Sequence, residues 1–497
     1  MNIFEEEKNR QIIPRWLPFR ETCKLIPPQA IDTSWMSRSV SPEALAIKRL
    51  EWNAHHHLIY AIDLVCSANL VGETNDSAVR EAAAFILQES ETTPTVRGVA
   101  SLLLKRDAEP YSIDTVAVPE IRQRIHLLRK AAAGSRDPFL FLDLAFYYTL
   151  LAQNLKAVRC VGIALALGDD NPIVLRAAAR FHLHADRSPE KALSLLRKAS
   201  VTPYHPLLLA SEISISEAFE LKSPFRRIGG RLLLADFHPW ILAELAGTVG
   251  TLELNSQSTR RAKEAFRLAV RCPNENTLAQ LQWISNRLSV PVNIEPSCRP
   301  EATFEADTIA HFRAEEYGQA LDSAVKWMRF QPFTARPAVL ASFISSVALE
   351  DYDTSIALLR EALIASPDSF TLRNNLVFAL ASKGQTEEAF ESMRPVDTGR
   401  LSPKDAAVAS ATLGLIAFRR GETEQGREFY SAASREFGRL GDKHHAIVAE
   451  VFWAREEHLA RTKQSAEVVA RALSKSKNLK GFKVVEQLKR ALQANAT

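Results

Sequence analysis

The sequence predicts an all-α protein, an α-solenoid of antiparallel helical hairpins. The main observation is a residue, usually small, that recurs along the chain, mostly at intervals of 34 to 40 residues. These anchor positions are Ala157, Ala192, Arg227, Ala262, Ala320, Ser355, Ala389, Gly426 and Ala466. A period of this length fits two short helices and the turns that join them.

Apolar residues at helical spacing follow the anchors, which is the second observation. Leu359 and Ala362 share one helix face with Ser355, and Pro367 then stops that helix. Gly384 lies five residues before the next anchor, where a glycine ends one helix and lets the chain turn into another. The pattern predicts one hairpin in each period, with the anchor at the point where its two helices come close.

Helix–turn–helix units of this length resemble the tetratricopeptide repeat (TPR) family. The resemblance covers roughly residues 137–475 and is best around Gly384 and around Leu413-Gly414 with Gly421. No unit has the family's full pattern of tryptophan, leucine-glycine and tyrosine in its first helix, and Arg227 stands where a small residue is expected. The resemblance implies a superhelix whose concave groove is lined by the first helices and binds other proteins.

Prolines and irregular stretches suggest the domain boundaries. The predicted parts are 1–40 (an extended arm of prolines and aromatic residues), 41–136 (an N-terminal helical region), 137–288 (a first solenoid arm), 289–300 (a proline-rich interruption), 301–475 (a second solenoid arm) and 476–497 (a C-terminal capping helix). The interruption accounts for the long interval between Ala262 and Ala320. The N-terminal arm has two interpretations: it lies along the first helices, or it docks another chain.

Polar residues followed by proline mark several helix starts. Ser41-Pro42 predicts a helix to about Leu70, with His55–His57 inside it. Three adjacent histidines point about 100° apart around a helix, so they cannot all ligate one metal ion. Further helices are predicted near Asp76–Ser90, Thr95–Lys105 and Pro119–Ala133, after Asp137-Pro138, Asn171-Pro172 and Ser188-Pro189, and over Leu473–Ala494, with a break or bend at Gly229-Gly230.

Composition is that of an ordinary globular protein. The chain has 497 residues, 46% hydrophobic and 24% charged, and its net charge of +4 is too small to indicate a nucleic-acid partner by itself. Its five cysteines are scattered and form no CxxC pair, which favours free or buried thiols over disulfides. The N-terminus is acidic, and even the longest apolar stretches, such as Leu140–Leu151, are too short to span a bilayer. These features predict a cytoplasmic protein without a membrane partner.

Common catalytic patterns do not occur in the sequence. It lacks GxxxxGK[ST], GxGxxG, HExxH and GxSxG, and His444-His445 and His458 lack carboxylates at metal-binding spacing. Asp169-Asp170 and Glu456-Glu457 are interpreted as solvated charges. We therefore expect no enzyme activity, no catalytic residue, no cofactor and no metal.

The resemblance places the residue eleven before each anchor in the groove. These residues are Phe146, Phe181, Ser216, Thr251, Ile309, Ile344, Phe378 and Leu415, six of them large and apolar. The six apolar ones and Asn374 with Asn375 are the candidate partner-binding residues. Two interpretations stay open: a surface for a partner peptide or helix, or packing against the neighbouring helix. Groove lysines that would clamp a carboxylate are missing.

The expected function is that of a protein-binding scaffold or adaptor. An alternative is a regulatory or nucleic-acid-associated role for a basic C-terminal end with Phe482 beside it. Its basic residues are Arg471, Lys475, Lys477, Lys480, Lys483, Lys489 and Arg490. Such a run also fits a solvated helix face.

Overall fold

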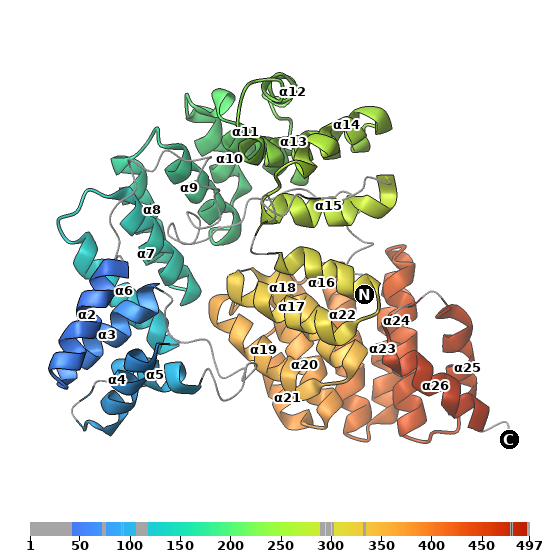
Figure 1. The fold of residues 1–497 in the computed structure, drawn as a ribbon. Helices are drawn as coiled ribbons and strands as arrows, with labels where there is room; N and C mark the ends of the chain where they lie inside the picture. Colours follow the sequence, from blue (N-terminus) through green and yellow to red (C-terminus); the bar gives the residue numbers. More distant parts are fainter. Residues whose placement is uncertain are drawn as a thin grey trace. The chain divides into compact units, whose positions relative to one another are not determined.

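The computed structural model describes residues 42–71, 76–90, 92, 94–105, 118–288, 294, 300, 303–331, 334–477, 479 and 481–494. Within these residues every regular element is a helix (Figure 1), so the predicted all-α class is confirmed. The predicted arm over residues 1–40 and nearly all of the predicted interruption over residues 289–300 lie outside the described residues.

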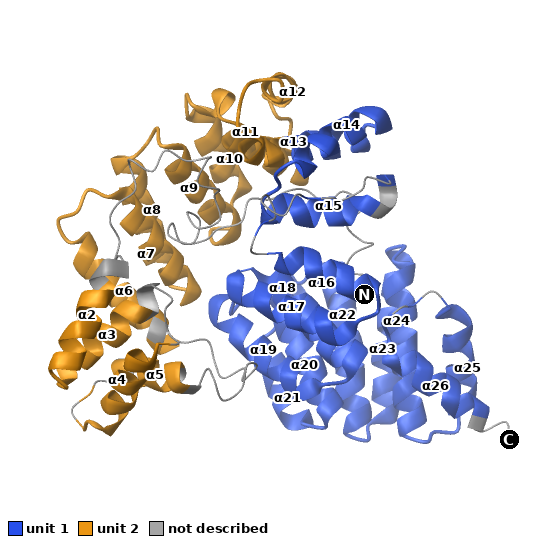
Figure 2. Cartoon of the chain, viewed as in Figure 1, with its two compact units in different colours: residues 1–12, 246–497 blue, residues 13–245 orange. Residues whose placement is uncertain are grey.

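The chain falls into two compact units (Figure 2). Unit 2 comprises residues 13–245, and unit 1 comprises residues 246–497 with residues 1–12. Their boundary lies inside helix α13 (Pro239–Asn255). The sequence-based division into parts, with its boundary at 289–300, stays a prediction.

Unit 2 is built from short helices joined by tight turns. They are α2 (Pro42–Ala54), α3 (Leu58–Val71), α4 (Ser77–Gln88), α5 (Pro94–Lys105), α6 (Val118–Ala132), α7 (Pro138–Leu150), α8 (Asn154–Leu167), α9 (Pro172–His184), α10 (Pro189–Lys198), η3 (Thr202–Tyr204), α11 (Pro206–Ala218) and α12 (Arg226–Leu232). The predicted helix starts are confirmed where Asp137, Asn171 and Ser188 accept backbone N–H groups as N-caps.

One predicted helix of unit 2 is wrong. The helix expected over residues 42–70 is two helices, α2 and α3, and His55–His57 form the turn between them. The Nδ1 atom of His57 accepts the backbone N–H of Ile59 at 3.3 Å, so the histidine side chain caps the first turn of α3.

Unit 1 continues the hairpins. Its helices after α13 are α14 (Thr259–Val270), α15 (Glu275–Leu288), α16 (Phe304–Arg313), α17 (Tyr317–Phe330), α18 (Ala335–Phe343), the π-helical turn η5 (Ile344–Leu349), α19 (Tyr352–Ala365), α20 (Phe370–Lys383), α21 (Thr386–Met393), η6 (Thr398–Arg400), α22 (Pro403–Arg419), α23 (Thr423–Arg439), α24 (Lys443–Leu459), α25 (Ser465–Lys475) and α26 (Lys483–Ala494). The single helix predicted over Leu473–Ala494 is wrong, because α25 ends at Lys475 and Gly481 adopts a φ of +76° before α26 begins.

The anchors occupy one structural position in the hairpins. Seven of them are buried and are the fourth residue of a second helix: Ala157, Ala192, Ala262, Ala320, Ser355, Ala389 and Gly426. Arg227 and Ala466 are exposed and are the second residue of α12 and α25. A small side chain is needed at the fourth position because the first helix crosses there.

Helices α22 and α23 show how close this crossing is. A Cβ atom added to Gly426 would lie 3.1 Å from the carbonyl oxygen of Gly414, and one added to Gly414 would lie 3.1 Å from the carbonyl oxygen of Gly426 and 2.8 Å from the ring of Tyr430. Neither glycine leaves room for a side chain. The backbones themselves therefore form the contact between these two helices.

The turn inside each of these hairpins uses left-handed backbone. The residue five before the anchor has a positive φ in all seven: Ala152 (54°), Arg187 (49°), Gln257 (61°), Glu315 (63°), Glu350 (61°), Gly384 (93°) and Gly421 (84°). The next amide then donates to a carbonyl near the end of the first helix, as from Gln385 to Leu380 at 2.9 Å. The predicted glycine turn at Gly384 is confirmed, and five hairpins make the same turn without glycine.

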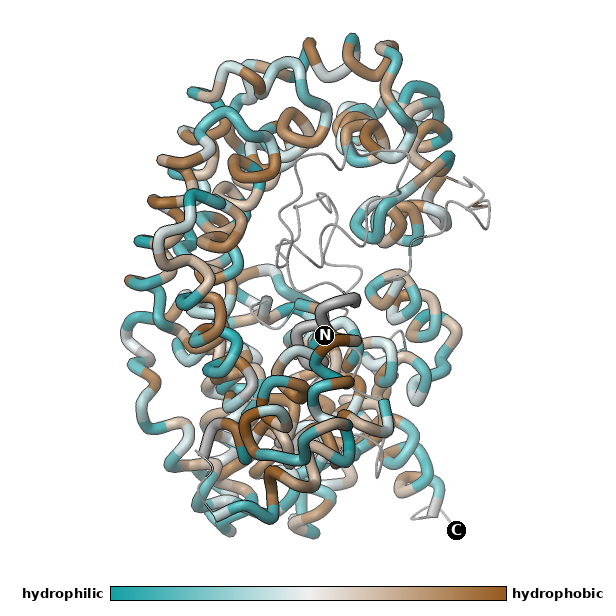
Figure 3. Tube along the Cα trace, turned by 60° about the vertical axis from the view of Figure 1, so that its left-hand side comes forward, coloured by the Kyte–Doolittle hydropathy of each residue, from teal (hydrophilic) through white to brown (hydrophobic). Residues whose placement is uncertain are grey.

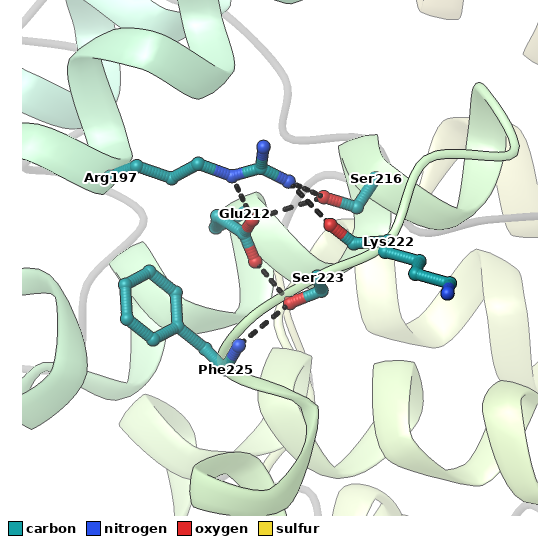
Figure 4. Close-up of polar contacts among 6 residues, drawn as sticks. All are labelled: Arg197, Glu212, Ser216, Lys222, Ser223 and Phe225. Atoms are coloured by element: carbon teal, nitrogen blue, oxygen red, sulfur yellow. Dashed lines mark hydrogen bonds and ion pairs between the residues drawn. The ribbon is translucent and has the colours of Figure 1, made fainter.

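The chain after α11 departs from the hairpin pattern, and a buried carboxylate holds it there (Figure 4). Glu212 is fully buried on α11 and accepts hydrogen bonds from Arg197 Nε at 2.8 Å, Ser216 Oγ at 3.0 Å and Ser223 Oγ. Arg197 also donates to the backbone carbonyl of Lys222 at 2.8 Å. These bonds fix an irregular loop in place of the first turn of a second helix, which explains why Arg227 is not an anchor.

Along many of the described helices, hydrophobic and hydrophilic residues alternate (Figure 3), as in amphipathic helices that bury one face and leave the other in water. Helix α11 is an exception, because every residue from Pro206 to Ser216 is buried. In unit 2 the resulting core includes Trp52, Leu64, Ile86 and Val99 at the start of the unit. No described helix is both long enough and apolar enough to cross a membrane.

Replacing Gln257 by glycine should stabilise unit 1 by about 1 kcal/mol, because glycine adopts the left-handed conformation without the penalty that a Cβ atom brings. The reverse change, Gly384→Ala, should destabilise it by a similar amount. No atom lies within 4 Å of the added Cβ, so only backbone strain is introduced. Thermal unfolding of both variants measures the shifts, and a lower melting temperature for Gln257→Gly would contradict this account of the turns.

Candidate functional site

The first helices of the later hairpins in unit 1 form one continuous row. Helix α18 packs on α20, α20 on α22, and α22 on α24. No comparable packing joins α19 to α21 or α21 to α23. The row that packs more closely lies on the inside of a curved stack, so we call α18 with η5, α20, α22 and α24 the inner row.

The C-terminal helix α26 lies on the inner row as well as against the last hairpin. It contacts α24, α25 and η5. The ring of Phe482, just before α26, lies 5.5 Å from the ring of Phe343 and 6.3 Å from the ring of Phe452, between centroids. Val485 and Leu488 of α26 are buried as well. The apolar side of α26 thus covers aromatic side chains from both ends of the inner row.

Polar contacts at the end of η5 orient α26. Lys483 donates from Nζ to the carbonyl oxygen of Leu349 at 3.1 Å and pairs with Glu350 at 3.3 Å. Gln487 donates to the same carboxylate at 2.8 Å. Leu349 ends a helix, where carbonyl groups lack partners within the helix. The lysine satisfies one of them, and Phe343, Leu349, Glu350 and Phe452 together define what we call the α26 seat.

Two buried carboxylates fix α24 in the inner row. Glu457 is fully buried and accepts a bidentate pair of hydrogen bonds from Arg427 of α23, from Nε at 2.7 Å and from Nη2 at 3.0 Å. Trp453 Nε1 donates to it at 2.9 Å, and Thr462 donates as well. Burial alone raises the pKa of Glu457, but the hydrogen bonds from Arg427, Thr462 and Trp453 outweigh burial and hold that pKa below its ordinary value.

Glu456 is the second of these carboxylates. It pairs with Arg419 of α22 at 2.6 Å and with Arg455 at 2.7 Å. Burial lowers the pKa of Arg455, but the charge of Glu456 and its hydrogen bond, together with Tyr352 and Tyr430, outweigh burial, so the pKa is raised. The interpretation of Glu456-Glu457 as solvated charges is therefore wrong, because arginines from three helices enclose them. Asp169-Asp170 is exposed, as expected.

The eight candidate partner-binding residues fall into two groups. Six are buried at 5% exposure or less: Phe146, Phe181, Ile309, Ile344, Asn374 and Leu415. In this structure they present no surface to a partner, because helix packing encloses them. Phe378 and Asn375, both on α20, are half-buried and lie in the inner row.

Phe378 and Asn375 contact the neighbouring first helices. The ring of Phe378 lies 5.1 Å from that of Phe452, and the guanidinium of Arg455 lies 5.7 Å from the Phe378 ring. Asn375 donates to Ser342 Oγ of α18 at 3.2 Å. Phe378 therefore extends to α20 the aromatic surface that Phe482 covers.

The basic C-terminal end is partly engaged within unit 1. Lys475 pairs with Glu450 at 2.8 Å, and Arg471 lies over the ring of Trp453 at 5.4 Å. Phe482 is buried at 6% exposure, so the idea that it meets nucleic acid beside the lysines is wrong for this structure. Lys489 and Arg490 are exposed on the outer side of α26.

Reactive groups are few among the described residues. No group of three or more His, Cys, Asp or Glu residues in that part of the chain could hold a metal ion. The thiols of Cys66, Cys160 and Cys272 are buried. Burial raises the pKa of Cys66 to about 12, which keeps its thiol protonated and unreactive at neutral pH.

No family model matches the sequence, and no curated protein matches it. Among solved structures, the chain is similar to yeast Tom70, at 11% identity and a TM-score of 0.30 over 88% of this chain and 96% of that one. It is also similar to the APC/C hetero-tetramer Cut9–Hcn1, at 14% identity and a TM-score of 0.31 over 90% of this chain and 92% of that one. At these values the function has to be argued from this chain's own surfaces.

The variant Glu457→Gln should destabilise unit 1 by about 2–3 kcal/mol at pH 7, because it leaves the half-buried Arg427 without its full counter-charge. Since the folded-state pKa of Glu457 is lowered, its contribution is present above the ordinary pKa of about 4.5 and is lost as the pH falls through the folded value. The melting temperatures of variant and wild type should therefore converge in acid.

Glu424→Gln is the matched control, because Glu424 also pairs with Arg427 but is exposed. It should change stability by less than about 1 kcal/mol. Equal losses in the two variants at pH 7 would contradict the assignment of Glu457 as the carboxylate that fixes α24.

Proposed function

We propose that this chain is a non-enzymatic, cytoplasmic adaptor that holds a helix or peptide of another protein against the inner row of unit 1. The observation that carries the proposal is the α26 seat, where an amphipathic helix already lies on first helices. Helix-in-groove binding of this kind uses apolar side chains at helical spacing for affinity and polar contacts at the rim for orientation.

Phe378 and Asn375 are the candidate contact residues. Both lie on α20 between helices that contribute Phe343 and Phe452, and neither is fully buried. A partner lying across α20 therefore meets an aromatic ring and a side-chain amide. Of the six buried candidates, Ile344, Asn374 and Leu415 lie in the inner row and help to position the first helices on which a partner lies. The other three lie outside that row, on α7, α9 and α16: Phe146, Phe181 and Ile309.

The proposal is tested by affinity capture with the tagged full-length chain, at high salt and after nuclease treatment. Phe378→Asp should reduce the recovery of a salt-resistant protein partner about tenfold, because it places a carboxylate in the contact surface. Circular dichroism of the variant must match that of the wild type.

Phe390→Asp is the control. Phe390 is 40% exposed on α21, a second helix outside the inner row, so its replacement should leave recovery unchanged. Equal recovery by Phe378→Asp and wild type would contradict the proposal. If the captured material is lost at high salt or after nuclease treatment, the result would instead favour nucleic-acid binding by the exposed basic residues of the C-terminal end.

A further inference from the structure

We infer that α26 is a displaceable occupant of the inner row, and that the partner is an amphipathic helix with the same pattern of side chains. The inference rests on the proposed function and names the chemistry of the partner. The chain's own C-terminal helix covers the α26 seat, so α26 and a partner helix that uses this seat exclude each other.

The seat defines what such a helix must carry. An aromatic side chain fits between Phe343 and Phe452, where Phe482 lies. Apolar residues three and six positions later correspond to Val485 and Leu488. A basic residue directly after the aromatic one meets Glu350 and the free carbonyl at the end of η5, as Lys483 does.

Just before the seat, Gly481 lies close to side chains of α16 and α17. A Cβ atom added to Gly481 would lie 3.3 Å from the Tyr317 hydroxyl and 3.5 Å from the Phe312 ring. The left-handed φ of Gly481 favours glycine there. A partner helix that carries a small residue before its aromatic one satisfies the same constraint.

The contacts of α26 differ from those that hold the inner row together. Lys483 is half exposed, with 48% of its side-chain area accessible, so its ion pair with Glu350 lies at the rim. The buried pairs of Glu456 and Glu457 use arginines from α22, α23 and α24 and none from α26. When α26 leaves, this network keeps its charges paired and the inner row keeps its support.

The short linker between α25 and α26 determines how strongly α26 competes with a partner helix for the seat. Only residues 476–482 separate α25 from α26, so α26 is present at its own seat at a high effective concentration. A free helix of equal intrinsic affinity therefore binds weakly to the intact chain. It binds well only when the contacts of α26 are weakened.

The test measures binding of a fluorescent peptide of residues 479–494 to full-length chains. Leu488→Asp removes a buried contact of α26, and Leu492→Asp makes the same change on that helix at a residue that is 37% exposed. The peptide should bind the Leu488→Asp chain at least about tenfold more tightly than the Leu492→Asp chain or the wild type.

Peptide variants test the pattern itself. A Phe482→Ala peptide should lose binding to the Leu488→Asp chain, whereas a Lys489→Ala peptide should bind like the parent, because Lys489 is exposed and pairs with Glu486 of the same helix. Equal peptide affinity for all three chains, or no binding to a Leu488→Asp chain that is folded like the wild type, overturns the inference.

Hydrogen exchange of the wild-type chain decides the matter even if Leu488→Asp does not fold. The backbone amides of α26 should exchange at least about tenfold faster than those of α24, because α26 leaves its seat while the helices of the inner row stay packed on one another. Equal protection of the two helices overturns the inference. If a partner is captured equally by the wild type and by a folded Leu488→Asp chain, displacement fails while the proposed function stands.

Discussion

The close crossing of two helices at the fourth residue of each second helix is the constraint on which the structure depends. Where that residue is small, the helices approach until their backbones touch, as at Gly414 and Gly426. The chain must then reverse within a few residues, which forces left-handed backbone five positions earlier. Spacing, turn and crossing thus repeat together, and the hairpins of each unit stack as near copies.

The stacking also explains why charges are buried in the later part of unit 1. First helices that pack on one another leave little room for water along the inner row. The carboxylates of Glu456 and Glu457 on α24 are tolerated there because arginines of α22, α23 and α24 supply both charge and hydrogen bonds. Their arrangement fixes the direction of α24, and with it the position of Phe452 beneath Phe482.

The hairpins could be predicted from the sequence because small anchors, glycine turns and Asx-Pro or Ser-Pro starts leave traces at fixed local spacing. The left-handed turns at Gln257 and Glu350 could not be predicted, because the helix crossing imposes the positive φ there and the residue type does not indicate it. The turn at His55–His57 was missed because histidine is an uncommon cap.

The site itself was much less predictable. Lys483 and Leu349 lie 134 residues apart in the sequence, and no local sequence pattern predicts that α26 packs against η5. The residue eleven positions before each anchor does lie on a first helix. Most of these side chains are buried by helix packing, so the spacing could not distinguish surface residues from core residues. The pair Glu456-Glu457 gives one usable signal, because it follows the apolar run Val451–Ala454 after a single arginine, Arg455.

The central claim is that a partner lies on the inner row, and site-specific photo-cross-linking tests it most directly. A photoreactive benzoylphenylalanine is placed at position 375 of the full-length chain, in the inner row, or at position 390, on a second helix. We predict a protein adduct from position 375 that mass spectrometry identifies, and none of that protein from position 390. Adducts from position 390 alone, or equal adducts from both positions, would contradict the claim.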